Sequence, residues 1–145
     1  MFKQKIFIIS FILLIIIAVF NYLGVKFYLY WVYRWYDIPM HMLGGLWVSL
    51  FTLSVYSYFY KNVSILNYRR KVFTTVFIVL IFVIIFWEAF ELVGGITSWN
   101  NNGYWMDTLG DILNGFIGGT MGYLFFIRNK KCNVDLGCDY NSIIK

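Results

Sequence analysis

Six ionisable side chains form three short motifs inside or at the edge of apolar stretches. The motifs are Asp-x-x-x-His, Glu-x-x-Glu and Asp-x-x-x-Asp, formed by Asp37 and His41, Glu88 and Glu91, and Asp107 and Asp111. They contain five of the chain's seven acidic residues and its only histidine. Ionisable groups at membrane depth are costly and by default mark a functional site. The chemistry open to them is cation binding, proton transfer or acid–base catalysis.

Charge balance favours a bound cation. Five carboxylates gathered in a low-dielectric pocket cannot all stay ionised unaided. No lysine or arginine lies within the motifs, and Arg34 is the nearest in sequence to Asp37. Protons, one or two cations, or both must therefore compensate the charge. An oxygen-rich set with one imidazole suits Mg²⁺, Mn²⁺ or Ca²⁺ better than Zn²⁺. We expect the metal ligands to come from Asp37, His41, Glu88, Glu91, Asp107 and Asp111.

Helical spacing pairs the groups within each motif. Residues three or four apart share one face of a helix, so each motif projects its two groups together. Asn114, three residues after Asp111, extends the last stripe as a supporting residue. His41, Glu88 and Glu91 are the candidates for acid–base catalysis.

Composition and hydropathy predict an all-α, polytopic membrane protein. The chain of 145 residues is 61% hydrophobic, with a mean hydropathy of +0.69. A chain with these values is too apolar to be a soluble domain of this size. Four stretches are long enough to cross the hydrocarbon core, at residues 6–25, 38–60, 72–93 and 106–127. We expect a four-helix membrane domain over 1–127 and a cytoplasmic polar tail over 128–145.

The distribution of basic residues predicts the orientation. Placing both termini in the cytoplasm leaves ten lysines and arginines inside and only Lys26 and Arg34 outside. The net charge of +5 then reflects cytoplasmic flanks and not a nucleic-acid surface. In this orientation all three motifs lie in the outer leaflet, at the start of the second and fourth spans and the end of the third.

Two further patterns concern packing and the membrane surface. Residues 27–36 are mostly aromatic, which is typical of a belt at headgroup level or of a short re-entrant segment covering the site. The fourth span contains Gly110, Gly115, Gly118, Gly119 and Gly122. Such small residues, with Gly44 and Gly45 on the second span, allow close helix approach.

Two structural explanations compete with a functional site. Polar side chains can join membrane helices by hydrogen bonds worth about 1 kcal/mol or less each. The motifs could also sit in wetted helix ends, which suits Asp37 and Asp107 best and Glu88 least. Six ionisable groups are a poor choice for joining helices when Ser, Thr or Asn would serve, so we favour a site.

The motifs resemble those of the small VanZ-like and YjdF-like bacterial inner-membrane proteins. The similarity covers residues 36–122 and rests on three stretches: Tyr36-Asp37-x-x-x-His41-x-x-Gly44-Gly45, Trp87-Glu88-x-x-Glu91 and Asp107-Thr108-x-x-Asp111-x-x-Asn114-Gly115. It implies a multi-pass protein of the bacterial inner membrane. The VanZ branch is associated with glycopeptide (teicoplanin) resistance, but its pattern has Glu-x-x-Gln and a basic residue near the last motif. This chain has Glu91 instead and no such arginine, so the YjdF-like side is closer.

Three functions remain open from the sequence. The first is an outward-facing, cation-binding membrane protein, which could be a metal-dependent enzyme on a lipid or envelope precursor. The second is a proton- or cation-coupled permease, for which four helices leave little room unless the protein forms a homo-oligomer. The third is a non-catalytic accessory protein in the lipid bilayer.

Overall fold

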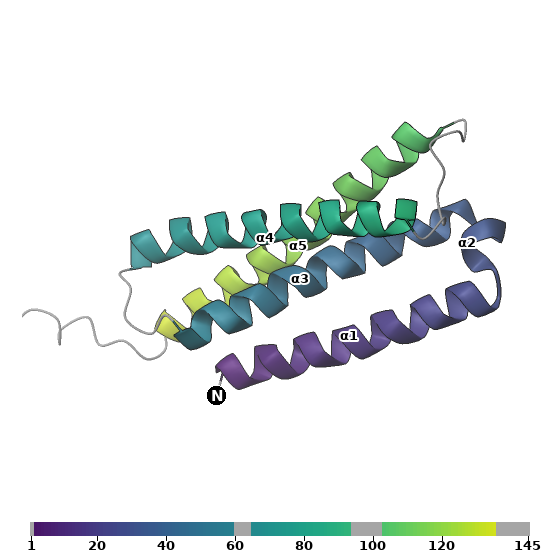
Figure 1. The fold of residues 1–145 in the computed structure, drawn as a ribbon. Coiled ribbons are helices and arrows are strands. Elements are labelled where there is room, and N and C mark those ends of the chain that lie inside the picture. The colour runs from purple at the N-terminus through teal and green to yellow at the C-terminus, as the bar shows by residue number, and fades with distance from the viewer. Residues whose placement is uncertain (1, 60–64, 94–102, 136–145) are drawn as a thin grey trace, which may run out of the picture.

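The computed structural model describes residues 2–59, 65–93 and 103–135 and contains only helices and turns in those ranges. The all-α prediction is therefore confirmed for the described part of the chain. Four long helices run along the molecule (Figure 1): α1 (Phe2–Lys26), α3 (Asp37–Phe59), α4 (Ile65–Val93) and α5 (Tyr104–Asp135). A short helix α2 (Leu29–Val32) and a 3-10 turn η1 (Arg34–Tyr36) connect α1 to α3.

Three of the helices are long and apolar enough to cross a membrane. These segments are Lys5–Lys26, Asp37–Phe59 and Arg70–Val93, and they coincide with the first three predicted spans. The fourth predicted span, 106–127, lies in α5 and is not among them. Its glycines, together with Asp107, Asp111 and Asn114, dilute the apolar side chains of that helix.

The boundary predicted between a membrane domain and a polar tail falls inside α5. The helix continues without a break past residue 127 to Asp135. The rest of the predicted tail, 136–145, lies outside the described residues, as does most of the loop between α4 and α5.

The helices alternate in direction, so α3 and α5 run parallel to each other (Figure 1). The N-terminal ends of α3 and α5 and the C-terminal end of α4 lie at the end of the bundle where α2 is found. The helix α3 packs against each of the other three long helices, most extensively against α5. All three sequence motifs are therefore at the same end of the molecule.

The apolar core occupies the opposite end of the bundle. Its buried members come from the first turns of α1, the second half of α3, the first half of α4 and the second half of α5: Ile6, Val48, Leu50, Leu53, Tyr56, Val72, Val76, Leu80 and Phe126. The buried carboxylates, Glu91 and Asp111, belong to the other halves of their helices. One end of the bundle is thus held by apolar packing, and the other contains the ionisable groups.

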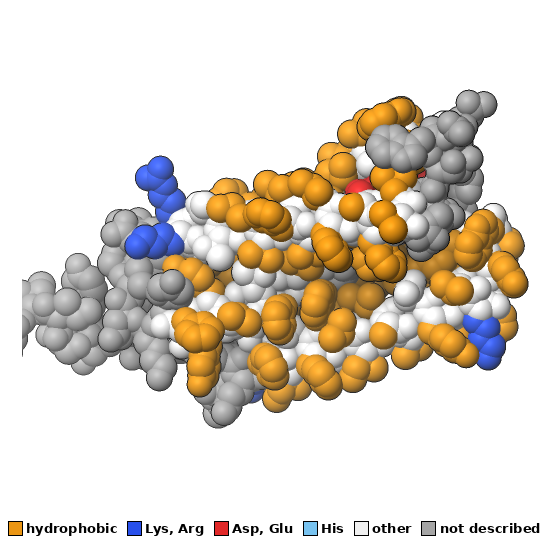
Figure 2. All heavy atoms as spheres, in the orientation of Figure 1, with side chains coloured by type: hydrophobic (Ala, Val, Ile, Leu, Met, Phe, Trp, Pro, Cys, Tyr) orange, Lys and Arg blue, Asp and Glu red, His pale blue; other side chains and the backbone are white. Residues whose placement is uncertain are grey.

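The outer surface is that expected of a protein surrounded by lipid. Hydrophobic side chains cover the visible face of the bundle, and the Lys and Arg side chains seen there lie at its two ends (Figure 2). On α4, for example, Phe82 and Phe86 are each more than 70% exposed. Large apolar side chains exposed on this scale would be unfavourable in water but are well placed against acyl chains.

Candidate functional site

Glycine contacts between α3 and α5 fix the position of the site. A Cβ on Gly45 would clash with the backbone carbonyl of Gly115, and a Cβ on Gly118 would clash with the carbonyl of Met42. The two helices therefore touch backbone to backbone, as small-xxx-small sequences allow. Gly44 and Gly110, in contrast, have no atom of the described residues within 4 Å of a Cβ position, so the prediction that these glycines serve packing is wrong for these two.

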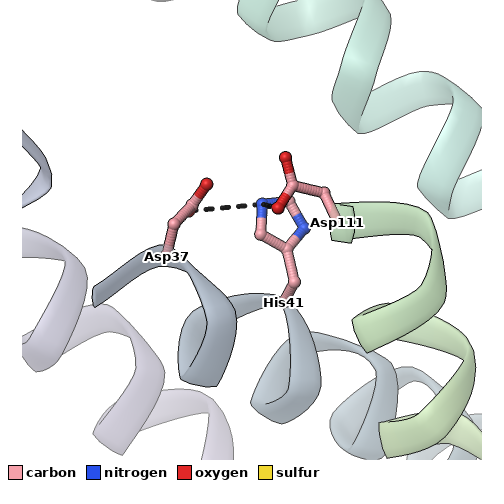
Figure 3. A group of neighbouring side chains, drawn as sticks. All are labelled: Asp37, His41 and Asp111. Atoms are coloured by element: carbon pink, nitrogen blue, oxygen red, sulfur yellow. Dashed lines mark ion pairs between the residues drawn. The ribbon is translucent and has the colours of Figure 1, made fainter. Parts of the chain in front are cut away.

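The close contact between Gly45 and Gly115 also brings His41 and Asp111 together. His41 lies four residues before Gly45, and Asp111 lies four residues before Gly115. Because α3 and α5 are parallel, one turn back from their closest contact places these two side chains opposite each other. Asp37, a further turn back on α3, completes the group (Figure 3).

One ring nitrogen of His41 lies between two carboxylates. Its Nε2 is 3.3 Å from Asp37 Oδ1 and 3.6 Å from Asp111 Oδ1. The side chains of Asp111 and His41 are 8% and 12% exposed, and that of Asp37 is 27% exposed. The carboxylates come from different helices and converge on the imidazole (Figure 3). The point between them suits either a proton on Nε2 or a cation.

Ligand geometry is compatible with a cation at that point. One potential ligand atom from each of Asp37, His41 and Asp111 lies within 4.8 Å of the other two. A cation about 2.1–2.4 Å from its ligands holds neighbouring ligands about 3.0–3.4 Å apart in octahedral geometry. The two nitrogen–oxygen distances are close to that range, so the three side chains lie near enough to share one cation.

The glutamates of α4 lie beside this group. Glu91 is buried, and its Oε1 accepts a hydrogen bond from Trp87 Nε1 at 2.7 Å. It interacts electrostatically with His41, Asp37 and Glu88. Glu88 is half-buried and interacts with the Thr108 side chain on α5, while its Oε1 is buried with no hydrogen-bond partner among the described residues. Both glutamates therefore interact electrostatically with the α3–α5 group from a third helix.

Besides the two glutamates, Asp107 and Asn114 were expected at the site and lie outside the group of three. Asp107 is exposed in the first turn of α5, one turn before Asp111. Asn114 is partly buried on α5. Among the described side chains, the only ion pairs of these acids are those with His41. No described lysine or arginine compensates their charge.

Sequence reasoning missed three residues near the site. Trp87 directly precedes Glu88, and its spacing of four residues from Glu91 on a helix indicates the hydrogen bond. Thr108 lies beside Asp107 and reaches Glu88 across the α4–α5 contact. Tyr30, in the aromatic connection, interacts electrostatically with Asp37 and Glu91. No sequence pattern distinguished Tyr30 from its aromatic neighbours.

Comparison with known protein families assigns the chain to one of them. Residues 2–131 match the family described as Predicted membrane protein (DUF2238). The chain belongs to this family. No curated protein and no solved structure matches it. Its DUF2238 membership and three apolar helices long enough to cross a bilayer together indicate an integral, multi-pass membrane protein. The match extends over all three motifs, so the site belongs to the family region of the chain.

Proposed function

We propose that this DUF2238 protein binds a divalent cation at Asp37, His41 and Asp111 and uses it on the outer side of the membrane. The observation that carries the proposal is the position of His41 Nε2 between carboxylates from two helices. A divalent cation with two ionised aspartates and a neutral imidazole makes the group electrically neutral. Without a cation, a proton on His41 alone leaves a net charge of −1, and neutrality requires a second proton on one of the aspartates.

The chemistry of the ligand atoms limits which cation the site can bind. One imidazole and two carboxylates, with Glu88 and Glu91 close by, form an oxygen-rich set that suits Mg²⁺, Mn²⁺ or Ca²⁺. Such a cation supplies Lewis acidity and a template for a phosphate or carbonyl oxygen. Glu91 and Glu88 are placed beside the group to take or give a proton. We infer a metal-dependent enzyme acting on a lipid or envelope precursor.

A proton- or cation-coupled permease is the alternative, and the glycine contacts argue against it. Next to His41, the backbone of Met42 is in direct contact with Gly118, and Gly45 is in contact with Gly115. The α3–α5 interface is therefore closed immediately beyond the site. Apolar core residues fill the remaining half of the bundle. This packing favours binding and catalysis at one end of the bundle over conduction along its axis.

Elemental analysis of detergent-purified protein tests the cation. Wild type and Asp107→Asn should retain a divalent ion in stoichiometric amount at millimolar Mg²⁺, Mn²⁺ or Ca²⁺, because Asp107 is exposed and outside the group. Asp111→Asn should lose the ion, since it removes one of the buried carboxylates. Wild-type protein without bound metal under these conditions would exclude the proposed site.

We also propose four membrane spans, with α5 as the fourth and both termini in the cytoplasm. The arrangement of the helices is consistent with this topology, since α5 returns along the bundle parallel to α3 (Figure 1). In this topology the site lies at the outer face, and the alternating helix directions and the charge bias support that position. The resemblance to VanZ-like and YjdF-like proteins suggests the bacterial inner membrane.

Cysteine labelling in intact cells tests this orientation. A membrane-impermeant maleimide should label Phe27→Cys, in a background with Cys132→Ser and Cys138→Ser, because Phe27 is exposed at the site end of the bundle. The native Cys132 and Cys138 should react only after permeabilisation. The reverse labelling pattern would place the site in the cytoplasm and overturn the topology.

A further inference from the structure

The connection between α1 and α3 turns sharply and is held against the end of α1. Tyr28 lies in the turn with a φ of 56°, the only positive φ of a non-glycine residue in the described ranges and a conformation that such residues rarely adopt. Tyr30 Oη donates a hydrogen bond to Asn21 Oδ1, and Tyr36 Oη donates one to the carbonyl oxygen of Phe20, each at 2.8 Å. The position of the connection is therefore fixed by contacts within the bundle.

The same fold leaves an apolar surface of the connection exposed. We define this connection surface by its four side chains, each at least 60% exposed: Tyr28, Trp31, Val32 and Trp35. It continues the exposed apolar side chains in the last turns of α1, such as Tyr22 and Val25. Hydrophobic side chains accordingly cover the end of the bundle where α2 lies, as they cover the long helices (Figure 2). The lipid-facing surface thus extends onto the connection.

The backbone of the connection is paired within its own short helices. In α2 the N–H groups of Trp31 and Val32 donate to the carbonyl oxygen of Tyr28, and in η1 the N–H group of Tyr36 donates to that of Tyr33. Unpaired peptide groups are costly away from water, and pairing them removes most of that cost. The segment can therefore leave bulk water and enter the edge of a bilayer.

A lysine lies where α1 meets this surface. Lys26 Nζ is 5.5 Å from the centre of the Tyr22 ring and 5.8 Å from that of the Phe27 ring. A lysine among aromatic rings at the end of a membrane helix is typical of the membrane–water interface. There the ammonium group reaches lipid phosphates and the rings lie at headgroup level. The charge next to the connection surface thus complements a lipid headgroup.

The packing of the connection distinguishes an interfacial segment from one that covers the site. The helix α2 packs against α1 and η1, and η1 packs against α3. Neither packs extensively against α4 or α5, which contribute Glu91 and Asp111 to the acidic end of the bundle. Side chains that covered the site would be buried against it, whereas those of the connection surface are exposed. Both observations favour the interfacial segment.

We propose that the connection is an interfacial anchor, whose surface of Tyr28, Trp31, Val32 and Trp35 inserts into the bilayer leaflet on the side of the site. Amphipathic segments of this kind bury their apolar face about 5–10 Å into the boundary between headgroups and acyl chains. Because Asp37 directly follows η1, the anchor holds the site at the depth of the lipid headgroups. The anchor does not depend on a bound cation.

Spin labelling of protein in phosphatidylcholine vesicles tests the anchor. Single labels at Val32→Cys and Trp35→Cys, in a background with Cys132→Ser and Cys138→Ser, report on α2 and η1. The measured quantity is the ratio of label collisions with oxygen, which partitions into lipid, to collisions with a water-soluble nickel complex. For both labels this ratio should lie above that of free label in buffer. It should lie below that of a label at Phe82→Cys, an exposed position in the middle of α4.

Three outcomes would overturn the anchor. A ratio equal to that of free label at both positions would place the connection in water. Few collisions with either reagent would show that protein covers the surface, as in a segment folded over the site. A raised ratio at only one position would show that α2 and η1 do not form one lipid-facing surface. Val32 is an exposed aliphatic side chain, so its replacement removes little packing and leaves the measurement informative if Trp35→Cys does not fold.

Discussion

Gly45→Ala should destabilise the protein by about 3 kcal/mol or more, the upper part of the range for overpacked sites. An alanine in the middle of a helix is intrinsically better than glycine by about 1 kcal/mol. At this position the added methyl group would clash with the Gly115 carbonyl. A backbone group cannot rotate away as a side chain can, so α5 must shift as a whole. That shift would separate Asp111 from His41 and weaken cation binding as well.

The adjacent residue is a matched control. No atom in the described part of the chain lies within 4 Å of a Cβ at Gly44, so Gly44→Ala should leave stability unchanged or raise it by up to about 1 kcal/mol. Equilibrium unfolding in mixed micelles measures both variants under the same conditions. Equal stabilities for the two variants would show that α3 and α5 are not in backbone contact at Gly45.

The helices were predictable because their signals are local. Uncharged runs of about 20 residues are long enough to span a bilayer, and three of the four predicted spans correspond to helices that meet this requirement. α5 was harder, since its glycines and acids lower its hydropathy while they build its contact with α3. The sequence therefore predicted the helix, whereas its passage through the membrane remains a proposal.

The site was only partly predictable, because helix rotation is set by packing. A spacing of three or four residues pairs groups on one helix but does not show which face meets which neighbour. The glycines indicate which face of α5 meets α3. Asp111 lies four residues before Gly115 and seven before Gly118, so it shares their face toward α3. Asp107 is one turn further out and exposed. Gly115, Gly118 and Asp111 thus belong to one pattern on one helix face, whereas Asp107 does not.

The aromatic connection could not be assigned from its composition. Seven aromatic residues among ten neighbours give no indication of which ring turns inward. In the structure Tyr30 and Tyr36 turn toward Gly24, while Trp31 and Trp35 are about 60% exposed. The distinction depends on a glycine in α1 and on hydroxyl partners at Asn21 and Phe20. These contacts are tertiary and leave no periodic signal in the sequence.

His41→Ala should remove the only nitrogen ligand of the bound cation. The affinity of the protein for the cation should fall to a small fraction of the wild-type value. Removing the imidazole leaves Asp37 and Asp111 without their shared partner. Loss of an outer-shell group lowers metal affinity about 10–100-fold, and loss of a direct ligand should lower it further. His41 is the only histidine of the chain. Any hyperfine coupling between a bound metal and an imidazole nitrogen can therefore be assigned to His41 without isotope labelling.

Pulsed EPR of the Mn²⁺-loaded protein tests the central claim most directly. Wild type should show hyperfine coupling to an imidazole nitrogen, Asp107→Asn should show the same coupling, and His41→Ala should show none. The coupling would place Mn²⁺ at His41, between the carboxylates of α3 and α5. Mn²⁺ bound to wild type without nitrogen coupling would contradict the account, because the cation would then lie away from the Asp37–His41–Asp111 group.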